Sequence, residues 1–107
     1  MSWGHAVTRD LLHWQHLPVA IEEYLDSSGD STMIFSGSAV VDHENTSGFF
    51  APDSPGIVAI YTSHVHRAGE GLRQHQSIAY SKDKGRTFTR YEKNPVVDIG
   101  RKDFRDP

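Results

Sequence analysis

The sequence contains no cysteine, which excludes disulfide bonds and thiolate metal sites. It also lacks any apolar run of about 18 residues, the length that a membrane-spanning helix requires. We therefore expect no membrane as a partner. Apolar residues with the spacing of an amphipathic helix are scarce as well, and this argues against a helical fold.

The net charge is low, at −3, and acidic and basic residues are interspersed without a basic stripe. Nucleic acid is therefore not an expected partner. Hydrophobic residues make up only 36% of the chain, which is little for a domain that must bury its own core. No signal-like segment opens the chain. A secreted or periplasmic location is favoured over a cytoplasmic one.

Both ends of the chain are unusual. The segment Trp3–Val7 is apolar and aromatic directly after the start, and the chain stops at Asp106 and Pro107. Native termini are more often polar and loose. We therefore interpret both ends as cuts in a longer protein.

Short apolar runs bounded by turn residues recur along the chain, a pattern typical of strands. The predicted strands are Trp3–Thr8, Pro18–Glu23, Met33–Val41, Ile57–His64, Ser77–Ser81 and Thr87–Tyr91. Segments rich in glycine, proline and small polar residues separate them and are predicted as loops. These loops are residues 26–31, 51–56 and 67–71. The sequence therefore predicts an all-β fold.

Two parts of the chain resemble each other. The segment Ala6–Asp10 aligns with Ala79–Asp83, and in both copies an aromatic residue and then a Pro-Val pair follow. Chance similarity of two strand-turn-strand units is one interpretation, and a repeated propeller blade is the other. The segment Ser81–Phe88 favours the blade, because it resembles the turn called an Asp box. In that turn an Asp side chain binds loop N–H groups, and a Gly supplies a positive φ.

A propeller blade is a four-stranded antiparallel sheet. The predicted strands amount to about two blades, too few to close a ring. Their faces would be left partly bare, so we expect this piece to be poorly stable alone.

Three ordered stretches resemble glycoside hydrolase family 32, which holds invertases, inulinases, levanases and related fructosyltransferases. The first is Trp3-Gly4-His5-Ala6-Val7 with Asp10-Leu11, His13-Trp14 and Leu17-Pro18-Val19-Ala20. The second is Phe35-Ser36-Gly37-Ser38-Ala39-Val40 with Asn45-Thr46-Ser47-Gly48-Phe49. The third runs from Gln76-Ser77-Ile78-Ala79-Tyr80-Ser81 through Asn94-Pro95-Val96 to Phe104-Arg105-Asp106-Pro107. Together they cover almost the whole chain.

The resemblance implies a five-bladed β-propeller, usually followed by a β-sandwich. Residues 1–107 would then be part of the N-terminal catalytic propeller domain. The implied reaction is hydrolysis of β-fructofuranosidic bonds in sucrose or fructans such as inulin and levan, with retention of configuration. Such a reaction needs a nucleophilic carboxylate and an acid/base carboxyl about 5 Å apart. No cofactor is implied.

The resemblance assigns roles to four residues. Asp106 matches the carboxylate that stabilises the transition state, and Arg105 would supply a fixed cation beside it. Phe35 and Ser36 match an apolar wall and a hydrogen-bonding group of the fructose subsite. Without the resemblance, Arg105 and Asp106 would be interpreted as a solvated ion pair or a turn before Pro107. Phe35 would be a core residue of a strand, and Ser36 a satisfied polar group.

Trp3 has two interpretations that remain open. Its ring can stack on a sugar face, or it can be buried between blades. His5 is interpreted as a structural, hydrogen-bonded residue. Gly37 and Ser38 are interpreted as residues that permit close packing of strands.

The other two carboxylates of the family are not found in this chain. The nucleophile belongs to an Asn-Asp-Pro-Asn-Gly-like motif upstream, and the acid/base to a Glu-Cys-like pair downstream. Glu22, Glu23 and Glu44 match neither motif. We therefore expect the 107-residue chain to be inactive by itself.

Three alternatives remain open. A fructosyltransferase would carry the same motifs, because water and sugar can both act as the acceptor. A non-catalytic, sugar-binding propeller module is the alternative from another functional class. His64 and His66 could share a strand face and chelate a metal. No acidic or cysteine partner has a recognisable spacing to them, so no metal is predicted.

Overall fold

The computed structural model describes residues 1–107 and contains strands and turns but no helix. The strands are β1 (Ala6–Thr8), β2 (Trp14–His16), β3 (Tyr24–Leu25), β4 (Ser31–Asp42), β5 (Gly56–Arg67), β6 (Glu70–Ser81), β7 (Thr89–Arg90) and β8 (Val97–Arg101). A two-stranded sheet contains β1 and β2. A six-stranded sheet has the order β3-β4-β5-β6-β7, with β8 also paired to β6. All pairs are antiparallel.

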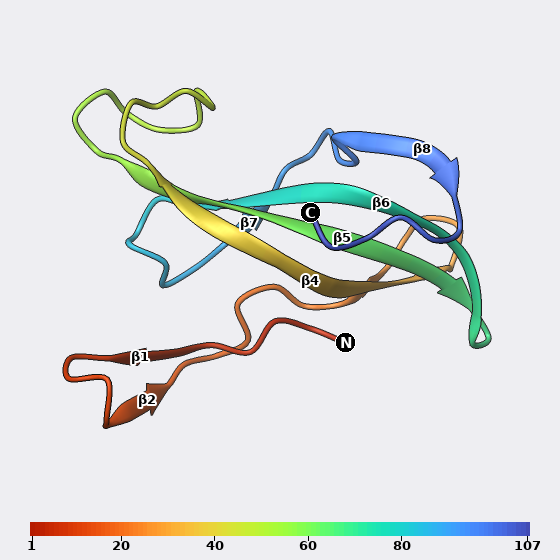
Figure 1. Ribbon diagram of the computed structural model, residues 1–107, viewed down its shortest axis with the longest axis horizontal. Coiled ribbons are helices and arrows are strands. Elements are labelled where there is room, and N and C mark those ends of the chain that lie inside the picture. The colour runs from red at the N-terminus through yellow and green to blue at the C-terminus, as the bar shows by residue number, and fades with distance from the viewer.

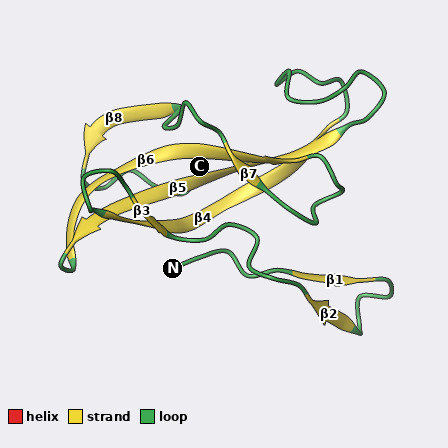
Figure 2. Ribbon diagram, turned by 180° about the vertical axis from the view of Figure 1, so that it is seen from behind, coloured by secondary structure: helices red, strands yellow, loops and turns green.

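The three long strands β4, β5 and β6 form the body of the molecule (Figure 1). The β1–β2 hairpin is set apart from them in both views (Figures 1 and 2). A bridge between Trp3 and Ile21, with hydrogen bonds from the Leu17 N–H to the His5 carbonyl and from the Glu23 N–H to the Ser2 hydroxyl, ties the start of the chain to the segment that follows this hairpin. The predicted all-β class is therefore confirmed.

The β5–β6 hairpin is longer than the sequence pattern indicates. Its loop consists of only Ala68 and Gly69, with φ of 50° and 81°. Two positive φ angles are characteristic of the tight turns that join twisted antiparallel strands. The predicted loop over residues 67–71 is therefore wrong at its edges, because Arg67, Glu70 and Gly71 belong to the strands. These strand ends consist of polar residues and glycine, so they do not appear as part of an apolar run in the sequence.

Other strand predictions need correction as well. The segment Pro18–Glu23 is not a strand, and only Ile21 in it forms a bridge. Pro18 has no N–H to contribute to a ladder, which disfavours pairing at that point.

Strands β2, β3 and β8 were not predicted. Strands β2 and β3 are only three and two residues long, and β2 has no apolar alternation. Strand β8 alternates Val97 and Ile99 with Asp98 and Gly100, but all of its residues are exposed and the run is too short to stand out in the sequence.

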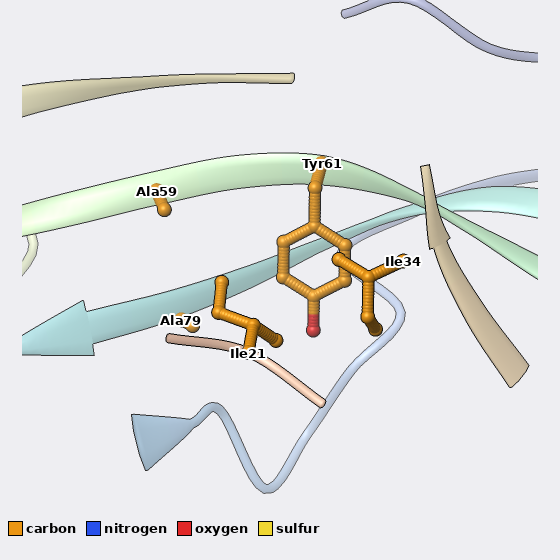
Figure 3. Close-up of a cluster of buried hydrophobic side chains, with 5 residues drawn as sticks. All are labelled: Ile21, Ile34, Ala59, Tyr61 and Ala79. Atoms are coloured by element: carbon orange, nitrogen blue, oxygen red, sulfur yellow. The ribbon is translucent and has the colours of Figure 1, made fainter. Parts of the chain in front are cut away.

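The core lies on one face of the long strands. Its members are Ile21, Ile34, Ala59, Tyr61 and Ala79, all buried (Figure 3). The Trp3 ring packs edge-on against the Tyr61 ring, with 6.0 Å between centroids. Five buried residues, two of them alanines, form a small core for a chain of this length. The expectation of low stability for the isolated piece remains a prediction.

Gly37 is required by close approach of β4 to β5. A Cβ atom at this position would lie 1.9 Å from the carbonyl oxygen of Ile60. This contact bears out the interpretation of Gly37 as a close-packing residue. We expect Gly37→Ala to lower the free energy of unfolding by about 1–3 kcal/mol, measured by urea denaturation. Gly4→Ala is the matched control, because nothing lies within 4 Å of its added Cβ; equal losses in both variants would contradict the assignment.

The turn after β6 has the expected Asp-box geometry. The Asp83 carboxylate accepts hydrogen bonds from the Thr87 N–H at 2.9 Å and from the Ser81 hydroxyl at 2.8 Å. Together with the Thr87 hydroxyl, these donors lower the pKa of Asp83 to about 2. Gly85 has a φ of 84°, and Phe88 packs against the core.

The corresponding turn after β1 shares part of this geometry. The Asp10 carboxylate accepts bonds from the N–H groups of Leu12 and His13, at 2.9 and 2.8 Å. The residues directly after the two aspartates, Leu11 and Lys84, both have positive φ, at 67° and 61°. The two sequence copies therefore build similar turns, which supports the interpretation of a structural repeat.

Candidate functional site

A β-bulge in β4 lies at Phe35 and Ser36. Strand pairing runs from Ile34 opposite Ser63 to Gly37 opposite Tyr61, so two residues of β4 face Thr62 alone. A bulge of this kind bends its strand and re-aims the side chains at that point. Phe35 is half-buried and Ser36 is exposed. Both predicted subsite residues are thus located at a local irregularity that leaves Ser36 accessible.

The Phe35 ring is stacked on the His64 ring of β5. The ring centroids are 4.6 Å apart, and the planes differ by 11°. His64 Nδ1 lies 3.0 Å from the amide nitrogen of Gln74, which faces His64 across the β5–β6 pair. The His64 ring therefore supports the Phe35 ring, and Gln74 of β6 holds the His64 ring in place.

Trp3 contacts the same bulge from the core side. Its indole N–H donates to the carbonyl oxygen of Phe35 at 2.9 Å. Its ring is half-buried and packs against the core residue Tyr61. These contacts give Trp3 a structural role at the bulge, while a stacking contact with sugar remains a prediction.

The C-terminal segment crosses the opposite face of the sheet from the core. Figures 1 and 2 show the C-terminus over the middle of β5. The Phe104 N–H donates to the Gln74 side-chain oxygen, and the Gln76 side-chain amide donates to the Phe104 carbonyl oxygen, both at 2.8 Å. The Asp106 N–H donates to the Thr62 hydroxyl oxygen at 3.2 Å. Side chains of β5 and β6 therefore hold Phe104–Asp106 much as a neighbouring strand would.

The side chains that hold this segment are buried and mutually bonded. Thr62, Gln74 and Gln76 are 0%, 3% and 4% exposed. The Thr62 hydroxyl donates to the Gln76 side-chain oxygen at 2.8 Å. Buried amides with all of their principal groups paired fix one geometry, because any other arrangement would leave a polar group unsatisfied. The position of Asp106 is thus specified by the sheet.

Thr62 is the residue that brings the predicted site together. It lies opposite the Phe35–Ser36 bulge in the β4–β5 register, and it binds the backbone of Asp106. Two motifs far apart in the sequence therefore meet at one point on β5. Ser36 and Asp106 are both exposed there, so they are available to a ligand.

The ion pairs beside Thr62 differ from those that the sequence suggests. Arg105 forms an ion pair with Asp103 and lies 3.3 Å from the Gln74 side-chain oxygen. Asp106 takes part in no ion pair of this chain. The reading of Arg105 and Asp106 as an ion pair with each other is therefore wrong.

His64 and His66 lie on one strand face, as expected for residues two apart. Their rings are stacked with 5.9 Å between centroids. The His64 Nδ1 is already engaged by Gln74, and no third His, Asp or Glu joins them in an arrangement that could hold a metal ion.

No supporting role was predicted for four residues of the site: Thr62, His64, Gln74 and Gln76. Their polar side chains alternate along β5 and β6, and the register pairs Thr62 with Gln76 and His64 with Gln74. A period of two in polar residues within a strand was the available signal. The sequence alone does not indicate that these polar side chains bind the chain's own C-terminal segment.

A groove of about 500 Å³ lies away from these residues. It follows the β1–β2 hairpin and is lined in part by Arg9, Asp10, His13, Trp14 and Arg86. Asp10 and His13 are already paired to each other at 2.6 Å. None of the predicted site residues contributes to this groove.

Comparisons with known proteins cover the whole chain. The family model described as the glycosyl hydrolases family 32 N-terminal domain matches residues 1–107. A levanase of Bacillus subtilis is 57% identical over 100% of this chain and 14% of its own length. An invertase of Schwanniomyces occidentalis is 49% identical over 100% of this chain and 19% of its own length. The chain thus spans less than a fifth of these curated relatives.

Solved structures of similar proteins give the same result. A β-fructofuranosidase of Schwanniomyces occidentalis complexed with fructosyl-erythritol superposes with a TM-score of 0.83 at 48% identity, covering 99% of this chain and 20% of that one. An exo-inulinase of Aspergillus awamori superposes with a TM-score of 0.76 at 45% identity, covering 90% of this chain and 20% of that one. The all-β sheets described above thus have the fold of the corresponding parts of these enzymes.

Proposed function

Because this chain belongs to glycosyl hydrolase family 32, we propose that the full-length protein hydrolyses β-fructofuranosidic bonds with retention of configuration. Residues 1–107 are proposed to be part of its N-terminal catalytic β-propeller, about two of five blades. The observation that carries this proposal is the meeting of the Phe35–Ser36 bulge and Asp106 at Thr62.

Asp106 is proposed to stabilise the transition state. When the fructosyl bond breaks, positive charge develops on the sugar ring, and hydrogen bonds to its hydroxyl groups strengthen. A fixed carboxylate that is free of any ion pair can accept two such bonds and oppose the developing charge. Because its backbone is held by Thr62, little reorganisation is needed during the reaction.

The other site residues are proposed to bind and orient the fructosyl ring. Phe35 supplies an apolar wall, the exposed hydroxyl of Ser36 a hydrogen bond, and Arg105 a cation next to Asp106. Trp3 is proposed to face the sugar with the accessible part of its ring while its N–H fixes the bulge. The nucleophile and the acid/base are proposed to come from other parts of the full-length protein, since the reaction needs two further carboxyl groups.

The proposed substrates are sucrose and fructans such as inulin and levan. Relatives are named levanase, invertase and exo-inulinase, and the solved neighbours hold fructosylnystose, fructosyl-erythritol or fructose. One relative is called an extracellular exo-inulinase, which supports a secreted or periplasmic location. No helix of this chain is long and apolar enough to cross a membrane. A net charge of −3 supports the expectation that nucleic acid is not a partner.

The test is an assay of the purified full-length protein on sucrose, inulin and levan. We expect release of fructose, and proton NMR at early times should show the β-anomer first, as retention requires. First appearance of the α-anomer would contradict the two-step mechanism, and no release from any substrate would reject the proposed activity. Accumulation of longer fructo-oligosaccharides at high sucrose would instead favour the transferase alternative.

A further inference from the structure

His64 and Gln74 connect the two sides of the proposed fructose site. His64 is stacked on Phe35, which is the proposed apolar wall. Gln74 binds the Phe104 N–H and lies 3.3 Å from an Arg105 guanidinium nitrogen. The two residues face each other across β5 and β6 and are joined at 3.0 Å. Neither belongs to the motifs that identify the family in this sequence.

The donors around Gln74 determine how its amide must point. Both the Phe104 N–H and the Arg105 guanidinium are donors, so they require the side-chain oxygen of Gln74. The amide NH2 must then face His64. Because an NH2 group can only donate, the Nδ1 atom of His64 must be the acceptor and carry no proton. The neutral ring therefore has its proton on Nε2.

Protonation of His64 is incompatible with this arrangement. A charged imidazole has an N–H at both nitrogens, so two donors would meet at the 3.0 Å contact. Either the His64 ring would leave Phe35, or Gln74 would turn its oxygen away from Phe104 and Arg105. In both cases one side of the site loses its support.

The surroundings of His64 favour the neutral ring. Burial, the neighbouring His66 ring and the Arg105 guanidinium lower the pKa of His64 below its ordinary value. Strand β4 presents Phe35 to the ring, and β6 presents Gln74 and Gly71, none of which titrates. No carboxylate contributes to the lowered pKa of His64.

We propose that His64 and Gln74 form a positioning pair that holds Phe35 and Arg105 in place together, and that the pair requires an uncharged His64. This proposal rests on the function proposed above, because the two residues that it positions are the proposed binding residues. A folded-state pKa below the ordinary value keeps the pair intact at neutral pH. The pair breaks as the pH falls below about 6.5, the ordinary histidine value, and through the lowered pKa.

The experiment uses the full-length protein and measures KM and kcat for sucrose from about pH 4 to about pH 8. This interval includes the range in which histidine titrates. We expect KM of the unaltered protein to rise about tenfold across the acid side of this range, as support for one wall is lost. His64→Phe retains a ring against Phe35 and cannot be protonated. Gln74→Glu retains acceptor oxygens for the Phe104 N–H and the Arg105 guanidinium. Its carboxylate can also accept a hydrogen bond from a protonated His64 Nδ1. The acid rise in KM should be absent from both variants.

A second readout does not depend on activity. In protein with 15N-labelled histidine, the ring-nitrogen shifts of His64, assigned by their loss in His64→Phe, report which nitrogen carries the proton. We expect the Nε2–H form at neutral pH, and a His64 pKa raised by about one unit or more in Gln74→Glu. His16→Phe, an exposed site on β2, is the control and should leave KM and the His64 signals unchanged.

The outcomes separate this inference from the proposed function. A proton on Nδ1 at neutral pH overturns the positioning pair whether or not the protein is active. Persistence of the acid rise in KM in His64→Phe also overturns it. If the unaltered protein cleaves no fructoside but shows the expected tautomer and the pKa change in Gln74→Glu, the proposed function fails and the structural pair stands.

Discussion

Asp106→Asn in the full-length protein should lower kcat by about a hundred- to a thousandfold, the loss seen when one fixed electrostatic group of a transition state is removed. KM should change much less, because the charge opposes a cation that is fully developed only in the transition state. The measurement is steady-state kinetics on sucrose, with kcat and KM determined separately.

The choice of Asn follows from the backbone at Asp106. Its φ of 65° lies in the left-handed region, which Asn and Asp tolerate better than other side chains with a Cβ. Asn also retains the size of the side chain and the N–H that binds Thr62. The substitution therefore removes the charge and leaves the segment in place, whereas Ala would add backbone strain.

Asp53→Asn is the matched control, because Asp53 is exposed in the loop between β4 and β5, outside the site. It should leave kcat unchanged. If Asp106→Asn retained full kcat and lowered only the melting temperature, Asp106 would have a structural role and the proposed mechanism would be wrong.

The fold class and the site residues could be predicted from different kinds of sequence signal. The apolar run Ile57–His64 indicated a strand because it has a buried face, whereas Met33–Val41 indicated one by its apolar residues alone, since only Ile34 in it is buried. Turn chemistry at Asp83 and Gly85 was visible because the required residue types are few. The family resemblance pointed to Phe35, Ser36 and Asp106, whose motif residues are distinctive.

The remaining features depend on register, which a single sequence does not reveal. The bulge at Phe35 and Ser36 exists because β5 supplies one residue where β4 supplies two. Thr62 is a site residue only because this register brings it opposite the bulge. Gln74 lies outside every strand that the sequence predicts, yet it belongs to β6 and is only 3% exposed. These are tertiary effects that act between segments far apart in the chain.

Gln76 should be as important for activity as a residue that touches substrate, although its own side chain is 4% exposed. Its amide donates to the Phe104 carbonyl oxygen, and its side-chain oxygen accepts from Thr62. Thr62 in turn binds the Asp106 N–H. Gln76 therefore fixes the segment that carries Asp106 through two connected routes.

Gln76→Met keeps the length of the side chain and removes both hydrogen-bonding groups. We expect kcat/KM on sucrose to fall by about a hundredfold, because a displacement of a reacting group by about 1 Å can cost that much. The free energy of unfolding should fall by about 1–3 kcal/mol, since the Thr62 hydroxyl and the Phe104 carbonyl lose a partner. Kinetics measured well below the melting temperature separate the two effects.

The control for Gln76→Met is Gln15→Met, at an exposed position on β2 where no side-chain hydrogen bond is lost. It should change neither kcat/KM nor stability. An unchanged kcat/KM in Gln76→Met together with reduced stability would mean that Gln76 supports the sheet alone, and that Asp106 is positioned by groups outside this chain. If the double variant Gln76→Met/Asp106→Asn loses much less than the sum of the two single losses, both residues act on one path, through Thr62, Phe104 and the Asp106 carboxylate.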